Sequence, residues 1–348
     1  MNLTLQIQPY VLPLVDPWPT RQGNPITQRR GSIVGIRSEQ QHGYGDCPPF
    51  PSAGTETFDS ASLLLQQIHC QTWSNGQSLL DELAQYQPTH PSVYYAVETA
   101  WLDLLGKLRQ QPMHQLIGES GSAKIAVNAL CGSLCTENTR KAQQQGFSVL
   151  KLKAGVDNLQ EEIHCLKKIC QHLPPKVQLR IDANGAWSMK AARFFLHSVE
   201  KLPIESIEEP LQNPGLKQIS QLQTETPHTL ALDESLIKFK LADVLSTPHI
   251  RRLVLKPAVQ GGLLKCFSIS ERAAQNNIDC VITTVVDSAV GVQASTHLAA
   301  AVDNICPRLA HGLATSNWLS KNLATPPEIK AGYITLSNHY GLGIDDLF

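Results

Sequence analysis

Lysine and acidic residues recur at nearly even spacing through the middle of the chain, and each closes a short apolar run. In order they stand in the segments Lys151-Leu152-Lys153, RIDANGAW with Asp182, SIEEP with Glu208, LALDES with Asp233 and RLVLKP with Lys256. The intervals between residues 153, 182, 208, 233 and 256 are 29, 26, 25 and 23 residues, each long enough for one strand, one helix and their loops. The repeat predicts a β/α barrel with charged groups at the carboxyl ends of its strands, where barrel active sites lie.

The residue types predict proton transfer beside a divalent metal. Strand alternation puts Lys151 and Lys153 on one face, where burial and a like charge would lower a lysine pKa and create a base. Asp182, Glu208 and Asp233 offer only oxygen ligands, which favour Mg²⁺, with Mn²⁺ as an alternative, over zinc. Because Mg²⁺ normally keeps positions for water or substrate, a small-molecule carboxylate could complete its coordination shell.

Composition bounds the class of protein. With 348 residues, 42% of them apolar, the chain is long enough for one barrel plus an accessory domain. A net charge of −1 with interspersed signs gives no reason to expect a nucleic-acid partner. We expect no membrane span and no signal peptide, and hence a cytoplasmic protein, because apolar runs are short and the first positive charge is Arg21. Nine cysteines without a C-x-x-C pair encode neither a disulfide framework nor a zinc site, and the oligomeric state is not visible.

The elements flanking the repeat predict an α/β fold, a modified TIM (β/α) barrel with an α+β capping domain. Residues 3–14 and 31–38 are expected to form an antiparallel pair of strands, and helical spacing covers residues 59–71 and 92–108. We assign residues 1–122 to the cap and 123–318 to the barrel, with its first strand in KIAVNAL (124–130) and its eighth in PRLAHGL (307–313). Residues 319–348 would return to the cap through a strand at 331–336.

The segment from Asp16 to Arg30 has no obvious secondary structure and carries Trp18, Arg21, Arg29 and Arg30. Long loops of this kind are often lids over an active site, although a mobile surface excursion is the plainer interpretation. A lid with aromatic and arginine side chains would suit an anionic organic substrate, and Arg30 is the substrate-binding candidate from this segment.

Together these motifs resemble the enolase superfamily, and more closely its o-succinylbenzoate synthase members, over nearly the full length. Finer similarity lies in Gly261-Gly262, in VVDSAVGVQASTHLAAA (285–301) and in HGLATSNWL (311–319). The resemblance implies that Lys151 and Lys153 are the K-x-K lysines, that Lys256 is the lysine of strand six, and that Asp182, Glu208 and Asp233 bind the metal. In each of the pairs Glu208-Glu209 and Asp233-Glu234 the first acid would be the ligand. It also suggests pocket-lining residues, namely Gly262, Ser288, Gly291 and His311.

For a synthase, the resemblance implies Mg²⁺-dependent dehydration of 2-succinyl-6-hydroxy-2,4-cyclohexadiene-1-carboxylate to 2-succinylbenzoate, a step toward menaquinone or phylloquinone. Lys153 would remove the proton next to the carboxylate and return one to the departing hydroxyl on the same face of the ring. Lys151 would lower the pKa of Lys153. Lys256, on the opposite face, would stabilise the enediolate by its charge, although it could instead be the base.

Other interpretations remain open at this point. An N-acylamino acid racemase or dipeptide epimerase would use the same lysines and metal, although such epimerases show Asp-x-Asp where this chain has HGLATS. A muconate-type cycloisomerase is a third enzyme. A silent barrel kept for binding would be expected to have lost one of the five charged strand ends, and a purely structural ion network would leave three acids repelling one another. Arg180, two residues before Asp182, could brace the metal site or form an ordinary interior ion pair.

Overall fold

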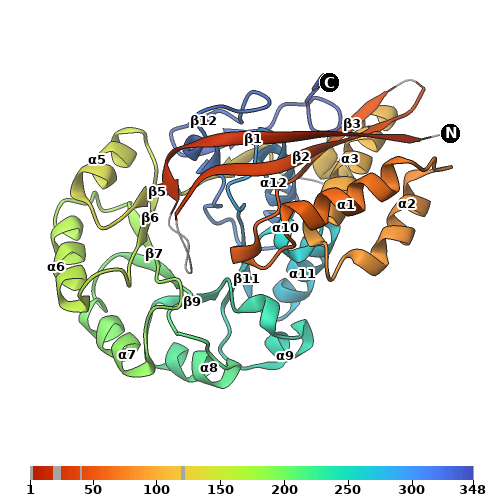
Figure 1. The fold of residues 1–348 in the computed structure, drawn as a ribbon. Helices are drawn as coiled ribbons and strands as arrows, with labels where there is room; N and C mark the ends of the chain where they lie inside the picture. The colour runs from red at the N-terminus through yellow and green to blue at the C-terminus, as the bar shows by residue number, and fades with distance from the viewer. Residues whose placement is uncertain (1–2, 19–24, 40, 119–121, 348) are drawn as a thin grey trace.

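An antiparallel sheet opens the chain. The structure is a computed structural model that describes residues 3–18, 25–39, 41–118 and 122–347. Strands β1 (Thr4–Trp18), β2 (Ile26–Arg37) and β3 (His42–Cys47) form the sheet in the order β1-β2-β3, as Figure 1 shows in red and orange. The predicted antiparallel pair is confirmed, and β3 is a third strand that the sequence analysis did not predict.

Helices α1 (Phe58–His69), α2 (Gly76–Leu83) and α3 (Pro91–Arg109) accompany this sheet. The predicted helices at 59–71 and 92–108 are confirmed as α1 and α3. Helix α3 packs directly on β3, because Gly45 has no side chain: a Cβ atom there would lie 1.9 Å from the carbonyl oxygen of Ala96. Apolar residues of the sheet and the three helices form a core of their own.

The middle of the chain forms a curled parallel sheet surrounded by helices (Figure 1), which confirms the predicted fold class. Its strands are β5 (Ala129–Gly132), β6 (Val149–Lys153), β7 (Gln178–Asp182), β8 (Ile204–Glu208), β9 (Thr229–Leu232), β10 (Arg252–Leu255) and β11 (Asp279–Ile282), each hydrogen-bonded to the next. The helices are α5 (Thr136–Gln144), α6 (Leu159–Cys170), α7 (Met189–Ser198), α8 (Leu216–Thr224), α9 (Leu241–Ser246), α10 (Pro257–Gln260), α11 (Leu263–Gln275) and α12 (Ala289–Val302).

The barrel closes at single bridges rather than through a full eighth strand. His311 bridges Val127 and Gly312 bridges Thr283, both in parallel orientation, so the strand predicted at 307–313 is reduced to two residues. The predicted first strand at 124–130 is also divided. Its first half is β4 (Lys124–Ala126), which leaves the barrel sheet and pairs antiparallel with β13 (Tyr333–Thr335), itself paired with β12 (Ile329–Lys330).

The C-terminal segment touches the N-terminal helices beyond β13. The Leu342 amide donates to Asp103 of α3, and Lys107 of α3 donates to the carbonyl of Ile344. Strand β13 itself pairs with β4 and not with the β1-β2-β3 sheet. The division of the chain into a cap and a barrel at residues 122 and 318 stays a prediction.

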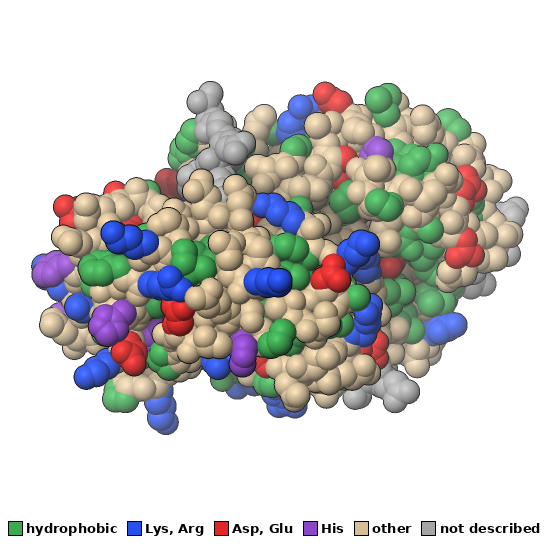
Figure 2. Space-filling view, turned by 90° about the horizontal axis from the view of Figure 1, so that it is seen from below, with side chains coloured by type: hydrophobic (Ala, Val, Ile, Leu, Met, Phe, Trp, Pro, Cys, Tyr) green, Lys and Arg blue, Asp and Glu red, His purple; other side chains and the backbone are tan. Residues whose placement is uncertain are grey.

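Charge is mixed over the surface seen in Figure 2, where lysine and arginine side chains are interspersed with acidic and uncharged ones. Within the described residues, no helix has the length and apolar character that a membrane crossing requires.

Candidate active site

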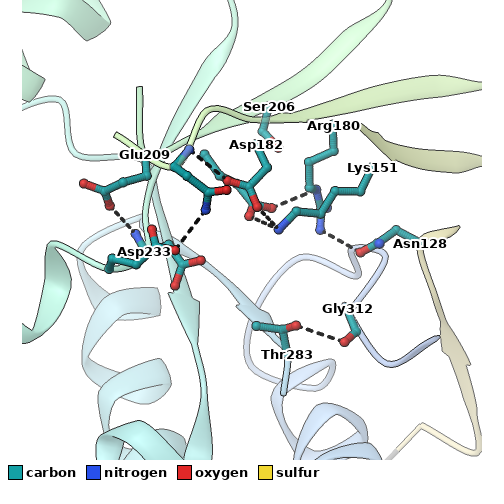
Figure 3. A network of polar contacts seen from close by, with 12 residues as sticks. Asn128, Lys151, Arg180, Asp182, Ser206, Glu209, Asp233, Thr283 and Gly312 are labelled. Atoms are coloured by element: carbon teal, nitrogen blue, oxygen red, sulfur yellow. Dashed lines mark hydrogen bonds and ion pairs between the residues drawn. The ribbon is translucent and has the colours of Figure 1, made fainter. Parts of the chain in front are cut away.

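The charged strand ends meet at one end of the barrel, which we call the barrel mouth. Strand register places Lys153 beside Asp182 and Asp182 beside Glu208, so three of the predicted residues are neighbours on adjacent strands. The Lys151 ammonium donates to Asp182 at 2.9 Å and is ion-paired with Glu208 as well. Figure 3 shows Lys151 and Asp182 pointing toward each other in this group.

Lys256 completes the group from the other side of the mouth. It follows β10, is ion-paired with Asp233 after β9, and is separated from β6 by three strands of the sheet. The structure therefore brings all six predicted catalytic and metal residues to the mouth, with two lysines on one side and the third on the other.

The carboxylates of the mouth determine the charge of Lys151 and Lys256. Burial alone would lower the pKa of Lys151, but the carboxylates of Asp182, Glu208 and Asp233 raise it above its ordinary value. The pKa of Lys256 is raised in the same way, against the effect of burial, by Asp233 and Glu234. Both side chains are therefore held as cations, and Lys151 is not the lysine that burial converts to a base.

The acids are not all equally compensated. Burial would raise the pKa of Asp182, but Lys151 and Lys256 hold it below its ordinary value. Burial raises the pKa of Asp233 well above its ordinary value, the charge of Glu234 raises it further, and Lys256 opposes the rise. Asp233 is thus a buried carboxylate whose lysine partner does not offset the cost of its charge.

Lys153 differs from the other two lysines. It ends β6 and is half-buried, yet among the described residues no carboxylate lies within 4 Å of its amino group. Its side chain is therefore free to approach a substrate, whereas Lys151 and Lys256 are occupied by acids.

The donor set suits Mg²⁺, although its oxygens now face ammonium groups. Asp182, Glu208 and Asp233 come from three consecutive strands and offer only carboxylate oxygens. In the part of the chain that the structure describes, no three acidic, histidine or cysteine side chains converge as a ready-made metal cage. Lys151 bridges two of the acids and Lys256 holds the third, so a divalent ion bound here would take over oxygens that these cations hold.

The two adjacent acids Glu208 and Glu209 make different contacts. Glu208 faces Lys151, whereas one carboxylate oxygen of Glu209 accepts hydrogen bonds from the Asp233 amide at 2.9 Å, the Ser235 amide at 3.1 Å and the Ser235 hydroxyl at 2.9 Å. This geometry supports Glu208 as the metal-ligand candidate, in agreement with the family pattern.

Beneath the mouth lies a second ion network, which we call the barrel floor and define as Arg180, Glu205, Arg252 and Asp279. Arg180 is 1% exposed and donates to Glu205 at 3.2 Å, and Arg252 is ion-paired with both Glu205 and Asp279. Arg180 also lies 3.7 Å from Glu208, so both interpretations of this arginine apply: it is an interior ion pair and it contacts the mouth.

Sequence reasoning missed Glu205 because of a local irregularity. Simple alternation puts residues 205 and 208 on opposite faces of a strand. The register between β7 and β8 shifts at this point, pairing Leu179 with Ile204 but Arg180 with Ser206, so Glu205 is the extra residue. No sequence signal marks this bulge.

The predicted lid is largely strand. β1 continues to Trp18 and β2 begins at Ile26, which corrects the loop predicted at 16–30; Arg21 lies outside the described residues. Arg29 is buried and donates to the carbonyls of Pro48, Pro49 and Val286, so its guanidinium serves the packing of the sheet against the barrel. Arg30 is exposed, and its guanidinium lies over the ring of Phe58, 4.2 Å from the ring centroid.

The remaining pocket candidates make contacts within the protein. Ser288 donates from its amide and hydroxyl to Asp46, and the Gly291 carbonyl accepts from Tyr95. His311 contacts Asp303 and accepts from the Ile282 amide, and Gly262 packs against the Glu98 carboxylate. All four are buried and none is joined to the lysines of the mouth by a hydrogen bond or ion pair, so a substrate contact for them stays a prediction.

A small pocket at the mouth is lined by Asp233, Glu234 and Lys256, with Ala53 of the 3₁₀-helix η1 (Pro51–Ala53) on its wall. It shares Ile237, Val259 and Gln260 with a larger cleft of about 540 Å³ that runs between the start of α3 and helices α9 and α11. The pocket that holds Asp233, Glu234 and Lys256 therefore adjoins a cleft between the N-terminal region and the barrel.

Comparison with known families agrees with this architecture. Residues 135–345 match the enolase C-terminal domain-like family, and residues 4–104 match the MenC N-terminal domain. The chain is 27% identical over 332 residues to an o-succinylbenzoate synthase of Thermosynechococcus vestitus, covering 91% of this chain and 94% of that protein.

Two further proteins show how far the likeness extends. The chain is 27% identical over 340 residues to the chloroplastic protein PHYLLO of Arabidopsis thaliana, covering 85% of this chain and only 20% of that protein. A dipeptide epimerase from Methylococcus capsulatus, solved with Mg and the dipeptide L-Arg-D-Lys, superimposes with a TM-score of 0.87 at 22% identity, covering 99% of this chain and 100% of that one. At this identity the last comparison shows the fold alone.

Proposed function

Since the chain belongs to the enolase superfamily, we propose that it is an o-succinylbenzoate synthase that dehydrates 2-succinyl-6-hydroxy-2,4-cyclohexadiene-1-carboxylate to 2-succinylbenzoate. The observation that carries the choice of substrate is the match of residues 4–104 to the MenC N-terminal domain, because related barrels change substrate through cap and loop contacts while they keep their proton chemistry. The synthase of Thermosynechococcus vestitus, similar over most of both chains, supports the same choice. The product would serve menaquinone or phylloquinone synthesis.

In this proposal the residues of the mouth would supply the groups that the elimination needs. Mg²⁺, or Mn²⁺ in its place, would be held by Asp182, Glu208 and Asp233, and when bound it would stabilise the negative charge that gathers on the substrate carboxylate as the neighbouring proton leaves. Lys153, which no carboxylate of the described chain occupies, would remove that proton as a neutral amine.

The two sides of the mouth would then act in turn. As the ring eliminates its hydroxyl, the Lys153 ammonium would return its proton to the departing oxygen, so the proton and the hydroxyl leave as one water and the ring becomes aromatic. Lys256, separated from β6 by three intervening strands and held as a cation, would face the developing enediolate from the opposite side. Lys151 would place a fixed positive charge beside Lys153 and between the two acids.

Racemisation or epimerisation of an N-acylamino acid or dipeptide is the second candidate, because it would use Lys153 and Lys256 as a two-base pair across one carbon, with one lysine removing the proton and the other, protonated, returning one. The position of these lysines on opposite sides of the mouth favours this chemistry as much as the elimination. The dipeptide epimerase fold match concerns the scaffold that both reactions would share.

A spectrophotometric assay separates the candidates. The purified protein would be given the cyclohexadiene carboxylate with Mg²⁺ and, separately, with a chelator, beside a panel of N-acyl amino acids and dipeptides in deuterated water. We expect fast aromatisation that the chelator abolishes. Exchange of the α-proton on a panel member without aromatisation would transfer the proposal to the epimerase, and no reaction in either arm would remove both.

A further inference from the structure

Glu209 has an unusual place beside the candidate metal ligands. It follows Glu208 directly, is 2% exposed, and has a φ of +42°, a left-handed conformation that side chains with a Cβ rarely adopt. Backbone strain of this kind persists where surrounding contacts fix the residue, and it concentrates at functional sites.

The main chain of Glu209 joins the segments on either side of it. Its amide donates to the carbonyl of Ala231 in β9 at 3.0 Å, and its carbonyl accepts from the amide of Gly185, in the loop after Asp182, at 2.6 Å. The left-handed turn at Glu209 therefore ties the end of β8 to both neighbouring strand ends.

The side chain adds a third connection. One carboxylate oxygen accepts the amides of Asp233 and Ser235 and the Ser235 hydroxyl, at 2.9 to 3.1 Å, as the Glu209–Asp233 contact in Figure 3 shows. The Asp233 carboxylate itself is turned to Lys256, so the loop that carries Asp233 is held by Glu209 rather than by its own acid. Asp182, Glu208 and Asp233 thus stand on three segments that meet at one residue.

We propose that Glu209 is a positioning residue that sets the mutual placement of the three candidate metal ligands without binding the metal itself. The proposal rests on the metal site of the proposed function but not on its organic substrate. Three donors already share the oxygen of Glu209 that faces the Asp233 loop, and hydrogen bonds to a charged acceptor are stronger than those between neutral groups. Loss of the charge should therefore loosen the Asp233 loop and weaken metal binding.

Glu209→Gln in the full chain tests this, with Glu271→Gln on the exposed face of α11 as the matched control. The amide keeps the size of the side chain and one acceptor oxygen for the three donors, so the variant removes the charge of the acceptor and little else. Mg²⁺ affinity would be measured by calorimetry and Mn²⁺ affinity by electron paramagnetic resonance, without organic substrate. We expect a loss of about 10- to 100-fold in both, as for other residues that orient metal ligands. The control should bind like the parent protein.

Amide hydrogen exchange gives a readout that needs no metal. In Glu209→Gln the segment 233–235 should exchange faster than in the parent, while circular dichroism shows an unchanged fold. If Glu209→Gln does not fold, Ser235→Ala decides, because it removes one of the three donors and should give a smaller loss of affinity in the same direction.

The outcomes keep the two proposals apart. Unchanged metal affinity and unchanged exchange in the variant that folds would overturn the role of Glu209 and leave the proposed reaction standing. If the aromatisation assay failed but Glu209→Gln clearly lost metal affinity, the proposed reaction would be overturned and the role of Glu209 would stand. A parent protein that binds neither Mg²⁺ nor Mn²⁺ would overturn both.

Discussion

The barrel holds two ion clusters, one above the other along the strands of one sheet. They differ in how completely their cations offset the burial of their acids. At the floor, Glu205 lies between Arg180 and Arg252, and although burial would raise its pKa, these arginines lower it to about 2. At the mouth, burial and Glu234 raise the pKa of Asp233 well above its ordinary value despite the presence of Lys256. The floor is electrostatically complete, whereas the mouth leaves an acid under-compensated.

The choice of cation explains the difference. Arginine offers a planar fork of donors that can engage a carboxylate through two nitrogens, as Arg180 does with Glu205, and it stays charged when buried. Lysine is a point charge that must be shared, as Lys151 is between Asp182 and Glu208. A cluster that is to admit a metal and a substrate needs the second arrangement, because its lysines must be able to release the carboxylate oxygens that the metal would bind.

Removal of the unoccupied lysine of the mouth should have the largest effect. Lys153→Ala should lower kcat by about 10³-fold, since general acid–base groups contribute on that order, while Mg²⁺ affinity and thermal stability stay at parent values. Stopped-flow absorbance of aromatisation and calorimetric titration of Mg²⁺ would measure the two. Lys201→Ala, at an exposed turn, is the control. Turnover near the parent rate would exclude Lys153 as the base.

Disruption of the floor should affect folding instead of chemistry. Glu205→Gln leaves Arg180 and Arg252 without their shared carboxylate, and breaking a buried ion pair on one side costs about 3 kcal/mol of unfolding free energy. Urea denaturation would measure this, beside Glu271→Gln. Mg²⁺ affinity should change little in comparison. If the variant lost more free energy of Mg²⁺ binding than free energy of unfolding, the two clusters would be one functional unit.

The mouth could be predicted from the sequence and the floor could not, for a physical reason. The mouth residues lie at or next to the carboxyl ends of successive strands, so regular spacing alone collects Lys153, Asp182 and Glu208 at one edge. The floor depends on a bulge between β7 and β8 that turns Glu205 inward, which no spacing reveals. The sequence could name Glu208 from the family pattern but gave no role to Glu209, because the groups that Glu209 contacts lie on neighbouring segments that spacing does not bring to it.

The predicted lid failed for another reason. Pro17 lies in the segment 16–30 that was predicted to be a loop, yet prolines are tolerated in a strand at the edge of a sheet, and β1 is such a strand and continues to Trp18. The arginines of the opposite strand were therefore assigned to a loop. Their partners, the carbonyls of Pro48 and Val286 for Arg29 and the ring of Phe58 for Arg30, are far along the chain or outside any recognisable motif.

Neutralisation of Asp233, the under-compensated acid, should weaken metal binding without unfolding the protein. Asp233→Asn should weaken Mg²⁺ binding and activity together, by about 100-fold, because an amide oxygen replaces a charged ligand. Calorimetry and the aromatisation assay would be run in parallel, with Asp243→Asn at an exposed position of α9 as the control. Lost activity with parent Mg²⁺ affinity would count against Asp233 as a ligand.

The smallest expected effect is a pH dependence that belongs to the floor alone. The pKa of Glu205 is lowered from 4.5 to about 2 in the folded protein, so the unfolded chain binds its proton more readily than the folded one as the solution becomes acidic. The stability that this carboxylate contributes is therefore complete well above pH 4.5 and is lost as the pH falls toward 2.

Between pH 7 and pH 4 the loss from this single group should be about 1 kcal/mol, because most of its titration in the folded state lies lower. Denaturation of the parent and of Glu205→Gln at both pH values isolates the contribution, since all other groups titrate in both proteins. The parent should lose more stability than the variant over this interval. Equal losses would mean that the arginines of the floor do not hold Glu205 ionised, and the contrast between a complete floor and an open mouth would lose its electrostatic basis.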